Sequence, residues 1–299
     1  MTDMIGYDTK NYYCHTYMSQ RERVTVTIRQ DLLRSLDRMV DHQRTRNRSH
    51  ALEVLLSNAF GTETRQDVIL ASGRGVKMRP FSYEIPKPLI AVKGRPLLEY
   101  SIELLAHYGI KDIIITTSHL AAKISDHFGD GSRFGTKITY VREQKLSGTG
   151  GALRATRKYL DDAPFILMYG DILLDLDITE FLQFHQNTKA AIGTLALTSV
   201  ADPSAFGAVR LRGTRVVEFS EKPTVSNDVS RLIFSGCATF NPSIFNFLPK
   251  QRGQLSLEED VFPRLIDQGR LYGYPFEGQW FDVSTPEIYE QVLKRWQTQ

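Results

Sequence analysis

The sequence predicts an α/β protein with a mostly parallel sheet flanked by helices, preceded by a small β-α-α module. From Asp67 onward, short β-branched runs alternate with segments of helical periodicity, which is the pattern of a parallel sheet covered on both faces. Before that point, residues 21–61 show one strand pattern and two short helix patterns, too little for a core of their own. We therefore expect domains at 21–61 and 67–299, joined by a linker at 62–66 and preceded by a flexible arm at 1–20.

Composition limits the class of protein. The chain has 299 residues, of which 41% are hydrophobic and 24% charged, as in ordinary soluble proteins. Its net charge of +3 is too small to indicate nucleic-acid binding by itself. The two cysteines, Cys14 and Cys237, lie far apart and fit neither a disulfide framework nor a metal site. Without a signal-peptide pattern or an apolar run near the roughly 18–20 residues that span a bilayer, we expect a cytoplasmic protein with no membrane partner.

The small module contains one strand and two helices. Strict alternation of polar and apolar residues over 23–29 predicts a strand with a single buried face. Helix patterns follow from Asp31 and from Asn47 or Ser49, and between residues 21 and 48 eight arginines outnumber four acidic residues. A lone exposed strand needs a partner, and the same strand of a second chain is the simplest one. We therefore expect a homodimer or a higher even oligomer.

This module resembles the ribbon-helix-helix DNA-binding domains in its strand alternation, helix lengths and turn position. In that family two strands pair antiparallel across a dimer and enter the major groove, while the start of the second helix holds a phosphate. A module that only dimerises, without binding DNA, is the alternative. The DNA-contacting residues that the resemblance implies are Arg23, Thr25, Thr27, Asn47, Arg48 and Ser49.

A glycine-rich loop follows the first strand of the larger domain. Residues 72–80 place two glycines among several cations directly after the apolar run 68–71. Glycine lets backbone N–H groups approach an anion, and the added cations indicate a polyphosphate. Asp171 follows another apolar run, 165–169, so it is expected at the same carboxyl edge of the sheet. A carboxylate beside a phosphate loop is a natural magnesium ligand, whereas a helix cap is disfavoured because Ile172 starts no helix.

The periodicity also gives the order of the elements. Apolar, β-branched runs predict strands, and apolar residues three and four positions apart predict helices. A proline that follows a threonine marks the start of the last helix. The expected strands are 68–71, 112–117, 137–141 and 165–169, and the expected helices are 97–107, 121–128, 150–158 and 286–295.

Seven ordered motifs occur between residues 67 and 295. They are the glycine loop with P-K-P-L (Leu70–Pro80 and Pro86–Leu89), S-G-T-G-G-A-L (Ser147–Leu153), G-D (Gly170-Asp171), E-K-P (Glu221–Pro223), F-S-G (Phe234–Gly236), S-L-E-E-D-V-F-P (Ser256–Pro263) and W-F-D-V-S-T-P (Trp280–Pro286). In this order they resemble the sugar-phosphate nucleotidyltransferases, whose Rossmann-like sheet the resemblance also implies. A single glycine loop would be a weak signal, but seven motifs in order are specific.

The resemblance implies transfer of a nucleotidyl group from a nucleoside triphosphate to a sugar 1-phosphate, with pyrophosphate as the leaving group. It implies Mg²⁺ held by Asp171 and Asp282, with Lys77 and Lys87 as further catalytic residues. No covalent intermediate is needed, so alignment and charge neutralisation would supply the catalysis. The nucleotide-binding residues would be Leu70, Ala71, Ser72, Gly73, Arg74, Gly75, Val76, Gly148 and Thr149, and the sugar-phosphate residues Gly207, Glu221, Lys222, Ser235 and Gly236.

The sequence departs from the family pattern in the opening loop. Ser72 replaces a glycine and Lys77 replaces an arginine, and Phe206 stands where tyrosine is more usual. Arginine offers phosphate a planar fork, whereas lysine is a point charge. Two alternatives to an enzyme with a DNA-binding module therefore stay open. One is a transcription regulator whose transferase domain only senses a nucleotide or nucleotide sugar, and the other is an enzyme that uses the small domain only to dimerise.

Overall fold

The computed structural model describes residues 25–40, 47–60, 64, 66–224, 230–250 and 253–297. Its contacts divide the chain into two compact units, Met1–Ala51 and Leu52–Gln299. The division falls within a helix rather than in the expected linker 62–66. Gln66, the last residue of that linker, is instead the first residue of strand β1 and pairs with Asp112.

The first unit contains helix α1 (Gln30–Met39) and the start of helix α2 (Arg48–Phe60). Asn47 caps α2, because its Oδ1 accepts a hydrogen bond from the His50 amide at 2.9 Å. The strand expected at 23–29 is not formed by a single chain: residues 25–29 carry no regular element, and residues 23 and 24 lie outside the described residues. In this one chain Val26 stays 57% exposed, as a strand without its partner would be.

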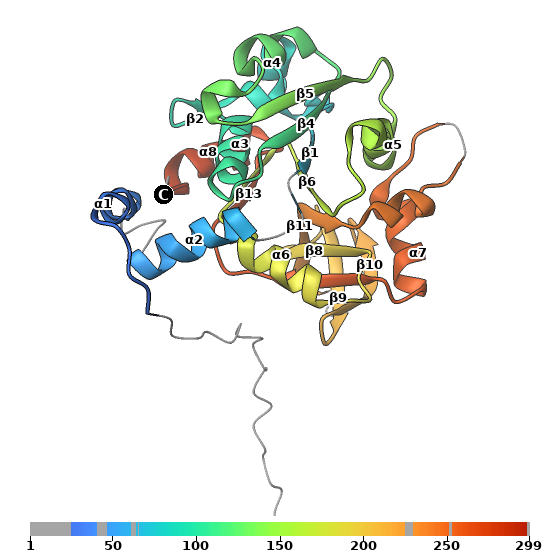
Figure 1. Ribbon diagram of the computed structural model, residues 1–299. Helices are drawn as coiled ribbons and strands as arrows, with labels where there is room; N and C mark the ends of the chain where they lie inside the picture. The colour runs from blue at the N-terminus through green and yellow to red at the C-terminus, as the bar shows by residue number, and fades with distance from the viewer. Residues whose placement is uncertain are drawn as a thin grey trace, which may run out of the picture. The chain divides into compact units, whose positions relative to one another are not determined.

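A mixed sheet is the centre of the second unit (Figure 1). Among the described residues nine strands run in the order β5-β4-β1-β6-β11-β8-β12-β10-β9. The first four are parallel, as expected, and β12 is parallel to β8; β11, β10 and β9 pair antiparallel with their neighbours. The strands are β1 (Gln66–Leu70), β4 (Asp112–Thr117), β5 (Lys137–Arg142), β6 (Phe165–Tyr169), β8 (Gly193–Ser199), β9 (Gly207–Arg212), β10 (Arg215–Glu221), β11 (Leu232–Phe240) and β12 (Leu271–Pro275).

Helices cover both faces of this sheet, which confirms the expected α/β class. Val68 of β1 points into a core shared with Leu153 and Phe262, while the next residue, Ile69, points into a second core with Ile102 and Phe181. This alternation is what a strand buried on both faces requires. The helices are α3 (Leu97–His107), α4 (Ala121–Phe128), α5 (Gly148–Thr156), α6 (Ile178–Asn187), α7 (Phe262–Asp267) and α8 (Pro286–Arg295).

Two short ladders complete the second unit. β2 (Ala91–Val92) pairs with β3 (Arg95–Pro96), and β7 (Ile172–Leu174) pairs antiparallel with β13 (Trp280–Asp282). Helix α8 follows β13 and is capped as expected by Thr285, whose Oγ1 accepts from the Ile288 amide at 3.4 Å. No helix in the described ranges is long and apolar enough to cross a membrane.

Candidate functional site

The loops after β1 and β6 meet at one edge of the sheet. The two strands are parallel, so their carboxyl ends lie side by side. The Gly170 amide donates to the Leu70 carbonyl at 2.9 Å, and the Ala71 amide donates to the Thr116 carbonyl of β4 at 3.1 Å. The glycine loop and the G-D motif are therefore adjacent, as the sequence predicts for an α/β sheet.

The glycine loop is open where an anion would approach. Gly75 has φ +60°, and its carbonyl accepts a hydrogen bond from the Ser82 hydroxyl at 2.7 Å. A Cβ on Gly73 would meet no atom within 4 Å, so this backbone faces free space. The Ser72 side chain is buried, and its carbonyl accepts a hydrogen bond from the Ser118 hydroxyl. Because its hydroxyl is covered by protein, Ser72 does not obstruct the approach that a glycine would allow.

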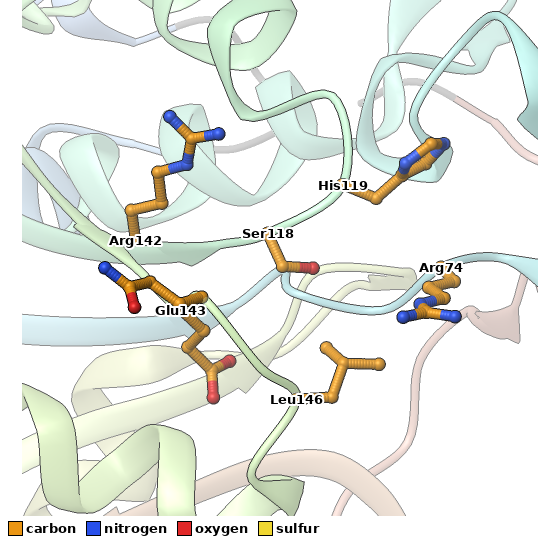
Figure 2. Close-up of a pocket in the computed structure, with 7 residues that line it drawn as sticks. Arg74, Ser118, His119, Arg142, Glu143 and Leu146 are labelled. Carbon is orange, nitrogen blue, oxygen red and sulfur yellow. The ribbon is translucent and has the colours of Figure 1, made fainter.

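A cavity of about 570 Å³ opens beside this loop. Figure 2 shows that its walls come from three separate segments, which follow β1, β4 and β5. Two arginines, Arg74 and Arg142, give the cavity a cationic lining. The Oε1 atom of its one acidic residue, Glu143, accepts hydrogen bonds from the amide and hydroxyl of Ser147. The lining residues are Arg74, Ser118, His119, Arg142, Glu143, Gln144 and Leu146.

Two carboxylates and two lysines lie next to the glycine loop. The Lys87 ammonium is 2.5 Å from Asp171 Oδ2, and the Lys87 side chain is only 10% exposed. The β7–β13 ladder brings Asp282 opposite Ile172, and the Val283 amide donates to the Asp171 carbonyl at 2.9 Å. Burial raises the pKa of Asp282 to about 6, with the Asp171 charge as a second cause, while Lys87 and Lys77 act in the opposite direction.

These carboxylates fit a divalent cation. Asp282 Oδ1 is buried and has no hydrogen-bond partner among the described residues, which is costly for an acceptor unless a ligand binds it. The described residues contain no group of three or more metal-ligating side chains. Mg²⁺ is commonly held by one or two carboxylates together with substrate phosphates, so Asp171 and Asp282 form a donor set of the expected kind.

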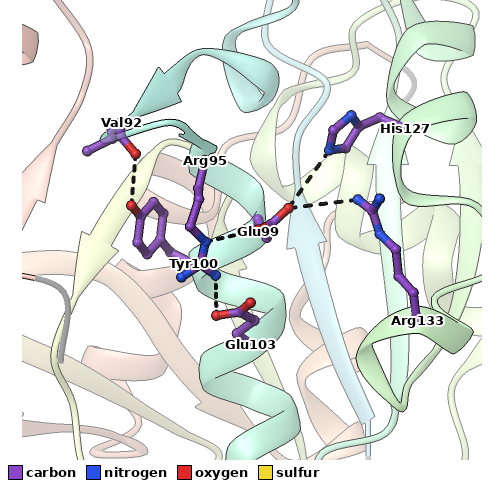
Figure 3. Close-up of polar contacts among 7 residues, drawn as sticks. All are labelled: Val92, Arg95, Glu99, Tyr100, Glu103, His127 and Arg133. Carbon is purple, nitrogen blue, oxygen red and sulfur yellow. Dashed lines mark hydrogen bonds and ion pairs between the residues drawn. The ribbon is translucent and has the colours of Figure 1, made fainter.

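A charged network fixes the segment after Lys87 (Figure 3). Arg95, in the β2–β3 hairpin, forms ion pairs with Glu99 and Glu103 of α3. Glu99 also lies 3.8 Å from His127 of α4 and from Arg133. The hairpin is thus tied to two helices that pack on the sheet, and the short helical turn Lys87–Leu89 directly before it is held in place.

The sugar-side motif lies at the end of β10. Lys222 Nζ is 2.6 Å from Glu221 Oε1, and this hydrogen bond raises the pKa of Lys222. Lys222 adopts φ +44°, and its amide donates to the Phe206 carbonyl at 2.9 Å. The Phe206 ring packs edge-on against Trp280, with 5.2 Å between the ring centroids. This arrangement joins the E-K-P motif to the segment that carries Asp282.

The other three residues predicted for the sugar side have structural contacts of their own. Ser235 is buried, its hydroxyl donates to the Ala196 carbonyl at 2.8 Å, and its own carbonyl accepts from the Trp280 indole at 2.8 Å. Gly207 faces the Phe219 ring, which a Cβ would meet at 2.2 Å. Gly236, at φ +82°, packs beside Tyr169. These residues shape the backbone of the site rather than present side chains to it.

Sequence reasoning missed the role of Glu258. Glu258 lies in the S-L-E-E-D-V-F-P motif, but nothing local in S-L-E-E-D indicates what its carboxylate contacts. In the structure it accepts hydrogen bonds from the hydroxyls of Thr149, Ser256 and Tyr169. Helix α5 also begins at Gly148, two residues earlier than expected, because Leu255 accepts hydrogen bonds from the amides of Gly150 and Gly151.

The predicted DNA-contacting residues belong to the first unit. Arg23 lies outside the described residues, whereas Thr25, Thr27 and Ser49 are exposed. The Arg48 guanidinium is engaged by Asp37, with 2.6 Å between Nε and Oδ1, so it is not a free cation. Asn47 uses its side-chain oxygen to cap α2.

Known proteins resemble this chain over the second unit. A family model described as nucleotidyl transferase matches residues 66–299. The mannose-1-phosphate guanylyltransferase of Mycobacterium tuberculosis is 35% identical over 225 residues, 74% of this chain and 62% of that protein. The UTP–glucose-1-phosphate uridylyltransferase of Synechocystis is 32% identical over 242 residues, 76% of this chain and 62% of that protein. A Bacillus anthracis structure with bound sucrose has a TM-score of 0.71 at 24% identity, covering 77% of this chain and 94% of that one.

Proposed function

The chain belongs to the nucleotidyl transferase family, and on that premise we propose that its second unit transfers a nucleotidyl group from a nucleoside triphosphate to a sugar 1-phosphate. One observation carries the proposal. Lys87 and Asp171 form a 2.5 Å ion pair beside the open glycine loop, and Asp282 adds a buried, unpartnered carboxylate oxygen. Cations for phosphates and carboxylates for a divalent ion are what this transfer requires.

The chain's own residues bind and align the two substrates. The open backbone at Gly73 receives the triphosphate, and Arg74 and Lys77 add positive charge around it. Lys87 neutralises charge at the transferred phosphate. Asp171 and Asp282 would hold Mg²⁺, which would neutralise charge on the phosphates that both substrates bring. Attack by the sugar phosphate oxygen on the α-phosphorus then releases pyrophosphate without a covalent enzyme intermediate.

Glu221 and Lys222 bind the second substrate. Their ion pair stands at the end of β10, and Lys222 suits a sugar phosphate while Glu221 accepts hydrogen bonds from sugar hydroxyls. The similar proteins are named for glucose 1-phosphate with UTP and for mannose 1-phosphate with a guanine nucleotide. We therefore propose a hexose or a related sugar 1-phosphate as acceptor, and a uracil or guanine nucleotide as donor. These substrates fit a cytoplasmic protein.

The chain spans 62% of the length of these two relatives, so the activity is tested on the chain itself. Pyrophosphate release is measured with Mg²⁺ and each pairing of UTP, GTP, ATP, CTP and dTTP with glucose, mannose, heptose and amino-sugar 1-phosphates. Turnover is expected with at least one pairing and is expected to disappear in Asp171→Asn. Nucleotide or nucleotide-sugar binding without any turnover would favour the alternative, a regulator that only senses its ligand.

We also propose that the first unit pairs with a second chain and binds DNA. Val26 and Leu32 are 57% and 51% exposed, as expected for apolar side chains that a second chain would cover. Thr25 and Thr27 are exposed, and threonine side chains can reach base edges. Such a module would let ligand binding by the second unit influence transcription, with equal and reciprocal coupling between ligand and DNA affinity.

The DNA proposal is tested on the full chain. Light scattering is expected to show a dimer or a higher even oligomer that a charged substitution, Val26→Glu, disrupts. Replacing Arg23, Thr25 and Thr27 by alanine is expected to weaken binding to selected DNA at moderate salt, while Lys189→Ala, at an exposed position of the second unit, serves as the control. Unchanged DNA affinity together with an intact dimer would favour the dimerisation-only alternative.

A further inference from the structure

Glu258 contacts both the start of α5 and the end of β6. It comes from the segment between β11 and α7, where residues Leu257–Val261 form one turn of π-helix. Such turns are frequent at functional sites because they re-aim a side chain that an α-helix would direct elsewhere. Here the Glu258 carboxylate is directed toward Thr149 at the start of α5 and Tyr169 at the end of β6.

Three hydroxyl groups donate to this one carboxylate. Thr149 Oγ1 and Ser256 Oγ each lie 2.7 Å from Oε2, and the Tyr169 hydroxyl bonds to Oε1. An ionised carboxylate only accepts hydrogen bonds, so each hydroxyl proton is aimed at Glu258. Hydrogen bonds to a charged group are stronger than neutral ones, which makes this contact a firm link between α5 and β6.

Thr149 is thereby held from two directions. Its Oγ1 donates to Glu258 and accepts from the Leu257 amide at 2.8 Å, which uses both roles of the hydroxyl. Gly150 and Gly151 give their amides to the Leu255 carbonyl, whereas the amides of Gly148 and Thr149 donate no hydrogen bond within the described residues. These two free donors are the ones that can serve a nucleotide.

Tyr169, the partner of Glu258 on β6, immediately precedes Gly170 and Asp171, the proposed metal ligand. The Tyr169 hydroxyl donates its hydrogen bond to Glu258 Oε1. The chain from Thr149 through Glu258 to Tyr169 thus fixes the free amides of α5 relative to the carboxyl end of β6.

We propose that Glu258 is a positioning residue of the transfer site, which holds the Gly148 and Thr149 amides in place for the nucleoside triphosphate. This inference rests on the proposed function and adds a residue to it. Glu258 acts through Thr149 and not on the substrate, so its loss weakens nucleotide binding more than sugar phosphate binding.

The test compares Glu258→Gln with Glu259→Gln in the full chain. Glu259 is the exposed neighbour on the same turn, and no hydrogen bond of its carboxylate is found among the described residues. The charges of Glu258 and Glu259 both raise the pKa of Lys222, so Glu259→Gln is the matched control for the loss of one negative charge. Binding of GTP and UTP with Mg²⁺ is measured by calorimetry, and KM is measured for both substrates of an active pairing. For Glu258→Gln we expect a nucleotide Kd and KM raised about tenfold and a sugar phosphate KM within about twofold of the unchanged chain.

A double-mutant cycle distinguishes positioning of the nucleotide-binding amides from a general contribution of Glu258 to the stability of the fold. Thr149→Val should raise the nucleotide Kd by a similar factor, and adding Glu258→Gln should change it little further, since the two residues act as a unit. Additive effects would overturn the inference, as would a lowered Tm with an unchanged nucleotide Kd, or a rise confined to the sugar phosphate KM. If the unchanged chain binds no nucleotide, the proposed function fails and this inference fails with it; if it binds and Glu258→Gln binds equally well, only the inference fails.

Discussion

Replacing Asp67 by valine should stabilise the protein. Asp67 is the second residue of β1, and it lies between Ile113 of β4 and Ile166 of β6 in the centre of the sheet. It is 0% exposed, and neither carboxylate oxygen has a hydrogen-bond partner among the described residues. Valine has a similar volume and suits a buried strand, so the substitution removes the polar group without leaving a cavity.

The size of the effect has two parts. An unsatisfied buried polar group costs about 1–3 kcal/mol, and this cost is present at every pH. Burial also raises the pKa of Asp67 well above its usual value, so at neutral pH the unfolded chain ionises this group and the folded chain resists doing so. The folded state therefore loses about 1.4 kcal/mol for each pH unit between the unfolded pKa and the folded pKa.

The stabilisation by Asp67→Val should grow as the pH rises. Below the unfolded pKa, about 3.9, both states are protonated and only the first part of the cost remains. As pH rises, the unfolded state gains the ionisation that the folded state lacks, so the advantage of Asp67→Val grows. A stabilisation of about 2 kcal/mol corresponds to a Tm higher by about 4–8 °C for a domain of this size.

The assay is urea and thermal unfolding at pH 5.5, 6.5 and 7.5, with Asp162→Val as control. The Asp162 side chain is 89% exposed, so its replacement should change stability by less than about 0.5 kcal/mol. A stability gain for Asp67→Val that is constant over this range would show that the pKa of Asp67 is not raised into the assayed range. A loss of stability would show that the carboxyl group has a partner that offsets its burial.

Three further predictions concern single contacts. Gly148→Ala should lower Tm by several degrees and abolish nucleotide binding, because φ is +79° and the new Cβ would lie 2.4 Å from the Leu255 carbonyl oxygen; normal binding in calorimetry would contradict this. Lys87→Gln should reduce pyrophosphate release about 10²–10³-fold at an unchanged Tm, and a rate equal to that of the exposed-site control Lys137→Gln would disprove its role. Thr285→Ala should cost about 1 kcal/mol in urea unfolding by removing the cap of α8, and no change would mean that Pro286 alone suffices.

Local pattern predicted the elements of the second unit well. The β-branched run at 112–117 and the apolar run at 165–169 became β4 and β6 with the expected bounds. Their length and composition carry that information, because a strand buried on both faces needs an unbroken apolar run. The same reasoning put the glycine loop and Asp171 at one edge, since parallel strands end on the same side. The first unit was less determined: residues 25–29, part of the expected strand, carry no regular element, because a lone strand has no neighbour to pair with.

Only the tertiary structure decided which distant segments meet. The sequence did not indicate that β11 would insert antiparallel beside β6. The family resemblance implied that Asp171 and Asp282 share a cation, but the β7–β13 ladder that brings Asp282 to Asp171 was not indicated. Nor did the sequence indicate that Leu255 and Glu258 would close over the start of α5, which begins two residues earlier than expected. Hydrophobic periodicity shows which face of each helix or strand is buried, whereas these contacts depend on which elements pack against one another. The sequence by itself therefore determined the chemistry of the site, and the packing of remote segments determined its geometry.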